Sequence, residues 1–470
     1  PSPRTASAVP TPPPPPPEFK SPVPPRRRPK PIAEANRPLP QPIAPLETQY
    51  PAQEPIIQLT EPKKPKLKKI SRKRLIIVVL ILLIGLGAGG YYFIKQRKVK
   101  QNTTPVVSQE PTIPKATGTI RFIASGDNFT FDSINAAAKK QDGSYDYTNL
   151  FSGVKPIFDK ADIKFCNESV PAAGTTIGIS GFPSFNAPPA FAKGLGDLGC
   201  NIINLGSKNI NDKGQAGIDA TVSYWDNQPE MLAVAGANRS AIDQTKIRYF
   251  TVKEVKFAFL SYTTGSNSPP QTPFGVNVYS DQLMQSQAAE ARKNAHLVIV
   301  AMNWGTEDSN DISPEQDRIA QALADQNVDI IIGSGAHVVQ PAKILDGKDK
   351  HQTLVWFNLG NMLNSQVPVN NLVGGIAVMD LDLETQNLKN PSFLPIYMHY
   401  EWTPEQKKRQ SQPDLLARHS FELMPLDKAA EKLAKSQNAT TVEAQTERLK
   451  GIVTKFAPIK MITSTDYLGQ

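Results

Sequence analysis

Polar side chains that could act as ligands or acid–base groups follow several apolar runs of the sequence. They are Asp127, Asn167, Glu168, Ser207, Asn303 and His337. Because ligands of open α/β sheets gather at the carboxyl ends of strands, these positions favour one shared site. Asp and Asn at strand ends also cap helices and form Asx turns, so both interpretations stay open at this point.

The apolar runs that precede these residues are mostly continuous and do not alternate strictly. Examples are residues 119–125, 161–166, 201–205 and 296–302. Continuous apolar runs are typical of strands that are covered on both faces. Helical intervals such as 282–295 and 313–326 separate several of them. The sequence therefore predicts a layered α/β domain over residues 117–402, with helices on a largely parallel or mixed sheet.

The first 74 residues differ in composition from the rest of the chain. The 470 residues have a formal net charge of +9, and residues 1–74 contain 22 of the 43 prolines with 15 basic and 5 acidic side chains. The remaining residues are almost neutral, so no nucleic-acid-binding face is expected on the folded part. We interpret residues 1–74 as a disordered, Pro-rich cytoplasmic tail. It is either a ligand for a proline-binding partner or a solvated spacer.

Residues 75–94 form an uncharged run of 20 residues. At 1.5 Å per residue this run covers about 30 Å, the thickness of the hydrocarbon layer, and predicts one transmembrane helix. Eight basic residues precede it and four follow it, which predicts a cytoplasmic N-terminus and a main domain outside the cytoplasm. Residues 95–116 are expected to be a stalk, and residues 403–470 a polar, partly helical C-terminal extension.

The two cysteines, Cys166 and Cys200, are expected to be free thiols. They are too few for a disulfide framework or a zinc site built from cysteines. Cys166 ends one predicted strand and Cys200 begins the next, so parallel strands would place them about 15 Å apart at ~3.3 Å per residue. That separation is too long for a disulfide bond.

Seven short motifs at these strand ends follow one another in a recognisable order. They are Gly126-Asp127, Ala161-Asp162 leading to Asn167-Glu168, Phe182 to Pro188, Leu205 to Gly214, Asn303 to Glu307, Gly333 to Pro341 and Asn358 to Asn361. In this order the chain resembles the CapA family of poly-γ-glutamate capsule biosynthesis proteins. The family's domain is similar to the calcineurin-like metallophosphatase fold, so the resemblance implies a layered sandwich of that type.

The resemblance also identifies the positions of the family's metal site. Positions that match are Asp127, Asn167, Glu168 and His337, with Asp212, Glu307 and Gln340 as motif neighbours. Positions that depart from the family pattern are Ser207, Lys208, Asn209, Asn303 and Gly335, where three expected histidines are absent. A two-metal centre needs several imidazoles and carboxylates, so the resemblance implies a degenerate site without a cofactor. A single Mn²⁺ or Zn²⁺ on the four matching residues is the alternative.

Lys208 is the most unusual of the departures, because an ammonium group is repelled by a divalent cation. One hypothesis is that Lys208 replaces the metal and pairs with Asp127 and Glu168. The alternative is that its side chain points to water.

Three functions are compatible with these observations. The first is a membrane-anchored, CapA-like protein that acts on an anionic envelope polymer with a non-catalytic or weakly catalytic site. The second is an active metal-dependent hydrolase or transferase. The third is a protein that links a cytoplasmic partner to the envelope. A Walker-type phosphate loop and a G-x-S-x-G elbow are absent from the sequence, which disfavours ATPases and serine hydrolases.

Overall fold

The structure is a computed structural model that describes residues 118–402, Glu405 and residues 418–469. The predicted tail, membrane span and stalk lie outside these residues. Within the described part of the chain, no helix has the length and apolar character needed to cross a membrane.

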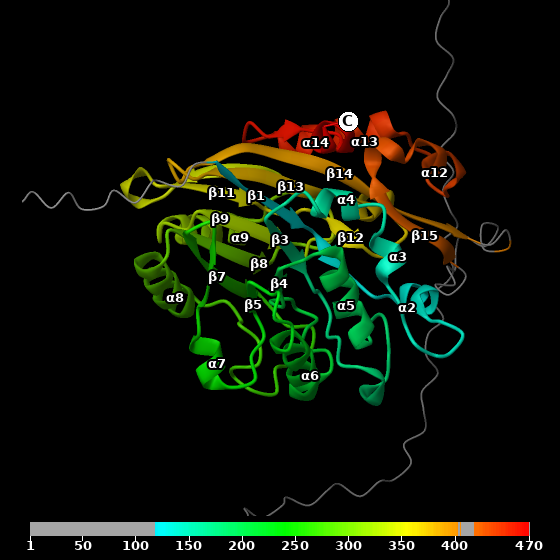
Figure 1. Ribbon diagram of the computed structural model, residues 1–470, viewed down its shortest axis with the longest axis horizontal. Helices are drawn as coiled ribbons and strands as arrows, with labels where there is room; N and C mark the ends of the chain where they lie inside the picture. Colours follow the sequence, from blue (N-terminus) through cyan, green and yellow to red (C-terminus); the bar gives the residue numbers. More distant parts are fainter. Residues whose placement is uncertain (1–117, 403–404, 406–417, 470) are drawn as a thin grey trace, which may run out of the picture. The chain divides into compact units, whose positions relative to one another are not determined.

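Two mixed β-sheets form the centre of the domain (Figure 1). The first sheet has the order β15-β14-β13-β1-β3-β4-β5, with β16 beside β14. Its strands are β1 (Thr119–Ser125), β3 (Ile163–Asn167), β4 (Ile202–Asn204), β5 (Ala233–Ala235), β13 (Val373–Asp382), β14 (Leu388–Trp402), β15 (Arg418–Pro425) and β16 (Lys460–Met461). Strands β1, β3, β4 and β5 are parallel, whereas β13 is antiparallel to β1.

The second sheet has the order β10-β11-β9-β8-β7-β6. Its strands are β6 (Arg248–Val252), β7 (Val255–Thr263), β8 (Leu297–Asn303), β9 (Ile330–Ser334), β10 (Ala342–Asp346) and β11 (Gln352–Trp356). The inner four are parallel, and β6 and β10 are antiparallel at the edges. A short pair joins β2 (Asp127–Asn128) to β12 (Asn361–Leu363).

The core lies between the two sheets and continues beneath the outer helices. Phe165 of β3 meets Phe259 of β7 across the interface, with ring centroids 5.9 Å apart. On the other face of the second sheet, alternate residues of β7 and β8 pack in a second cluster with α8 (Asp281–Asn294) and α9 (Pro314–Ala324). Strand β8 is therefore buried on both faces, which explains its continuous apolar sequence. The predicted α/β class with mixed sheets is confirmed.

Several of the remaining helices pack against the first sheet. The remaining helices are α2 (Asp132–Ala138), α3 (Thr148–Phe151), α4 (Lys155–Phe158), α5 (Pro189–Leu198), α6 (Gly214–Asp226), α7 (Ala241–Thr245), α10 (Val369–Leu372), α12 (Ala430–Lys435), α13 (Val442–Val453) and α14 (Ser464–Leu468). Figure 1 shows α13 and α14 (red) lying across β14. The segment 418–425, which the sequence predicts to be part of a polar C-terminal extension, forms β15 and pairs with β14.

The prediction of two free thiols is wrong, because Cys166 and Cys200 form a disulfide bond. Their strands are parallel neighbours. However, β4 begins only at Ile202, and Cys200 lies in the preceding turn, directly after the left-handed Gly199 (φ +104°) that ends α5. The chain before β4 therefore does not continue the strand axis, and the two Cα atoms are 5.9 Å apart.

Candidate functional site

Five strand ends bring the polar residues of the predicted site together. In register, Asn167 lies beside Asn204 in the first sheet, and Asn303 lies beside Ser334 in the second. Gly126 lets the chain leave β1 in close contact with its neighbour, because a Cβ atom there would lie 1.9 Å from a backbone carbonyl oxygen. The topology therefore places these residues as the sequence predicts, but the contacts that each side chain makes decide what the site does.

Asp127 is fully buried, and both of its carboxylate oxygens accept hydrogen bonds from the protein. The hydroxyl of Ser169 donates to Oδ1 at 2.7 Å, and the backbone N–H of Gly335 donates to Oδ2 at 2.9 Å. Gly335 has a φ of +98°, the left-handed region that glycine adopts without strain. The carboxylate of Asp127 therefore holds the loop after β9 against the end of β1.

Asn167 joins three strands of the first sheet through its side-chain amide. Its Nδ2 donates to the carbonyl of Ser125 at 3.0 Å, and its Oδ1 accepts from Nδ2 of Asn204 at 2.7 Å. Asn204 in turn accepts from the hydroxyl of Ser261 on β7. This chain of amides fixes the two sheets relative to each other.

Glu168 is completely buried and faces helix α6. Its Oε2 accepts a hydrogen bond from Nε1 of Trp225 at 2.5 Å, and its Oε1 has no hydrogen-bond partner among the described residues. Burial raises the pKa of Glu168 to about 8, and the hydrogen bond from Trp225 opposes this shift. The carboxyl group is therefore largely protonated at neutral pH.

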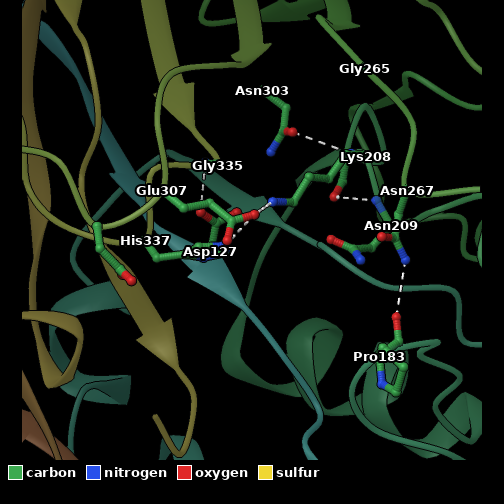
Figure 2. A network of polar contacts seen from close by, with 12 residues as sticks. Asp127, Pro183, Lys208, Asn209, Gly265, Asn267, Asn303, Glu307, Gly335 and His337 are labelled. Atoms are coloured by element: carbon green, nitrogen blue, oxygen red, sulfur yellow. Dashed lines mark hydrogen bonds and ion pairs between the residues drawn. The ribbon is translucent and has the colours of Figure 1, made fainter. Parts of the chain in front are cut away.

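Lys208 pairs with Glu307, as Figure 2 shows. The hypothesis of an ion pair with Asp127 and Glu168 is wrong, since neither carboxylate lies within 4.0 Å of the ammonium among the described ion pairs. The alternative of a solvent-directed side chain is also wrong, because the Lys208 side chain is only 25 % exposed. Burial lowers the pKa of Lys208, whereas Asp127 and other acidic neighbours raise it.

The neighbours of Lys208 fix its backbone. Ser207 donates its hydroxyl to the carbonyl of Ser169 at 2.8 Å, and Asn209 donates to Oδ2 of Asp212 at 3.2 Å. Asn303 accepts from the backbone N–H of Lys208 at 3.2 Å and donates to the hydroxyl of Ser334 at 3.1 Å. These three departures from the family pattern therefore make structural hydrogen bonds.

His337 lies at the edge of the cluster with a left-handed backbone (φ +63°) and is 7 % exposed. Its Nδ1 is 3.3 Å from Oδ1 of Asn361, an acceptor, so the neutral ring carries its proton on Nδ1. Its Nε2 is 4.0 Å from Oε1 of Glu307. Burial lowers the pKa of His337, and Asp127 opposes the shift. Phe129 packs against the ring with centroids 4.9 Å apart.

Three of the four residues predicted to hold a metal accept hydrogen bonds from other groups of the protein in this arrangement. The oxygens of Asp127 and Asn167 already accept protein hydrogen bonds, and Glu168 faces Trp225. Within residues 118–402 and 418–469, no three His, Cys, Asp or Glu side chains are grouped so that they could hold a metal ion. The site instead contains one ammonium group, one exposed carboxylate and one neutral imidazole.

Two residues of the site were not assigned from the sequence. Glu307 appeared only as a motif neighbour, and its position four residues after the end of β8 was the one available signal. Trp225 lies 57 residues from Glu168 along the chain, and nothing local connects the two.

Residues 121–366, more than half of the chain, match the family described as "Bacterial capsule synthesis protein PGA_cap". The chain belongs to this family. It is 31 % identical over 179 residues to the "PGA biosynthesis protein CapA" of Bacillus subtilis, covering 37 % of this chain and 45 % of the relative. It is 29 % identical over 181 residues to the "Capsule biosynthesis protein CapA" of Bacillus anthracis, covering 37 % and 42 %. The chain thus spans less than half the length of either relative, and the predicted resemblance to the CapA family is confirmed.

Solved structures resemble this PGA_cap family member more distantly. A phosphatase from Mycoplasma pneumoniae has a TM-score of 0.39 and 13 % identity, covering 60 % of this chain and 94 % of that one. A 5'-nucleotidase from Candida albicans has a TM-score of 0.33 and 11 % identity, covering 58 % and 51 %. Similarity at this level does not bear on the function of the chain.

Proposed function

We propose that this PGA_cap protein is a membrane-anchored component of the biosynthesis of an anionic envelope polymer of the poly-γ-glutamate type, with a site that binds and does not cleave. Family membership supports the process, since the two relatives are named for PGA and capsule biosynthesis. The domain is a layered sandwich of the calcineurin-like metallophosphatase type. Two facing mixed sheets with functional motifs at the strand ends support this assignment.

The proposal of a non-catalytic site rests on the contacts of the candidate metal ligands, which face other groups of the protein. Metal-dependent hydrolysis needs a cation that lowers the pKa of a bound water, held by ligands that converge on it. Here Glu168 faces Trp225, Asn167 faces Asn204, and the ammonium of Lys208 lies beside Glu307. This arrangement suits the binding of a charged chain better than its hydrolysis.

The anchor is the apolar segment 75–94, with the PGA_cap domain outside the cytoplasm. The uncharged length of the segment and the excess of basic residues before it support this topology. The disulfide bond between Cys166 and Cys200 also supports it, because disulfides persist in oxidising compartments. On this topology the Pro-rich tail is in the cytoplasm, where it is available to a proline-binding partner.

The test is to incubate the purified full chain with γ-linked polyglutamate in the presence of Mn²⁺ or Zn²⁺. We expect the polymer to bind, measured by co-sedimentation with protein-containing vesicles, and its length on a gel to stay constant. Metal-dependent shortening of the polymer would contradict the proposal and favour an active hydrolase. Vesicles without protein are the control for trapping of polymer.

A further inference from the structure

The ammonium of Lys208 has a single ion-pair partner among the described residues, Glu307, whose side chain is more exposed to solvent than that of Lys208. Glu307 is 59 % exposed, whereas the Lys208 side chain is 25 % exposed. The backbone of Lys208 is fixed on both sides: its N–H donates to Asn303, and its carbonyl accepts from the N–H of Asn267 at 2.7 Å. Figure 2 shows the carboxylate of Glu307 reaching Lys208 from a separate loop. A fixed cation thus holds an exposed carboxylate.

His337 contributes a second polar group next to the same carboxylate. Its side chain is 8 % exposed, and its Nε2 lies 4.0 Å from Oε1 of Glu307 without a hydrogen-bond partner among the described residues. Because Nδ1 faces the oxygen of Asn361, Nε2 of the neutral ring is an acceptor. A nearly buried acceptor therefore faces the position that the carboxylate of Glu307 occupies.

We propose that Lys208 and His337 form a subsite for an acidic peptide unit, and that Glu307 occupies it as an internal ligand which the polymer displaces. This inference rests on the proposed function and deepens it. In the displaced state, Lys208 donates to a carboxylate of the ligand, and Nε2 of His337 accepts an amide N–H from the same unit. A glutamyl residue presents both groups within a few bonds of each other.

The charges around Lys208 favour a ligand carboxylate that replaces Glu307 over one that binds beside it. Asp127, Asp212 and Asp308 all act on Lys208 through their negative charge. A second carboxylate added beside Glu307 would be repelled by all of them. When a ligand carboxylate replaces that of Glu307, the net charge around Lys208 stays the same. Binding should therefore depend on the release of Glu307.

The experiment measures the affinity of the full chain in detergent for a γ-linked glutamate tripeptide, by titration calorimetry at low salt. Glu307→Gln is expected to bind about two- to fivefold more tightly than the natural protein, because the exposed ion pair that competes with the ligand is weak. Lys208→Met is expected to bind at least about tenfold more weakly, since a charge-assisted hydrogen bond is lost. Lys208→Arg should retain most of the affinity, which separates loss of charge from loss of folding.

Two further comparisons test the chemistry of the subsite. The matched control is Glu431→Gln, which removes the carboxylate of another exposed Lys–Glu pair, on α12, and should leave the affinity unchanged. A tripeptide with its amide N–H groups methylated should bind more weakly to the natural protein, and His337→Asn should abolish this difference.

Three results would overturn the inference: equal affinity of Glu307→Gln and the natural protein, equal affinity of Lys208→Met and the natural protein, or no binding of the tripeptide by any variant. If long polymer still binds in a way that does not depend on Lys208, this inference fails while the proposed function stands. Metal-dependent shortening of the polymer would instead contradict the proposed function.

Discussion

Replacing Glu168 by Gln should remove much of the pH dependence of the stability of the fold. The pKa of this carboxyl group is about 8 in the folded protein, against 4.5 for an ordinary glutamate, because burial disfavours its charged form. A difference of one pKa unit corresponds to about 1.4 kcal/mol, so the group contributes on the order of 3–5 kcal/mol to the free energy of unfolding.

The direction of the pH dependence follows from whether the folded or the unfolded state binds the proton of Glu168 more tightly. Because the folded state does, the contribution of Glu168 is fully present below about pH 4.5 and is lost as the pH rises through about 8. The Gln variant can still accept the hydrogen bond from Trp225 and does not titrate in this window. We therefore expect it to gain stability relative to the natural protein as the pH rises from 5 to 9.

The assay is urea unfolding of both proteins between pH 5 and pH 9, followed by tryptophan fluorescence. The difference in unfolding free energy between variant and natural protein should change by a few kcal/mol across this range. Glu447→Gln, which changes an exposed glutamate in an i,i+3 pair on α13, is the control and should leave the pH profile unchanged. If the profiles of the Glu168 variant and the natural protein run parallel, Glu168 is not a protonated buried acid and the reasoning fails.

Two more predictions concern the framework of the domain. Replacing both Cys166 and Cys200 by Ala should lower the unfolding free energy by about 3–4 kcal/mol, as expected for a disulfide that closes a loop of this length. Urea unfolding checks this, and an unchanged midpoint would show that the bond does not form. Gly335→Ala should lower stability by about 1–3 kcal/mol, because φ is +98° and the added Cβ would lie 2.9 Å from a neighbouring amide nitrogen. Gly451→Ala on α13, where nothing lies within 4 Å of the added atom, should be neutral or stabilising in the same urea unfolding assay.

The strands and the positions of the polar residues could be predicted because both have a local signature. The run 297–302 is continuously apolar since β8 is covered by the other sheet on one face and by α8 and α9 on the other. Asn303 and the residues around Asp127 follow such runs directly, so topology alone brings them to one end of the sheets.

The partners of these residues could not be predicted, because they come from distant parts of the chain. Lys208 meets a carboxylate 99 residues away, and Glu168 meets an indole 57 residues away. The disulfide bond depends on how the chain turns at Gly199. The distance between neighbouring strands alone does not predict this turn. Strand β15 mixes polar and apolar residues and forms by pairing with the long β14, so its own residues carry no clear signal.

The most direct test of the central claim is the metal content of the purified full chain after dialysis against Mn²⁺ or Zn²⁺, together with its melting temperature with and without a chelator. A cation that binds the folded state raises the melting temperature by mass action. We predict far less than one ion per chain and the same melting temperature in both conditions. One or more tightly bound ions per chain, with a melting temperature that falls when the chelator is added, would contradict the account.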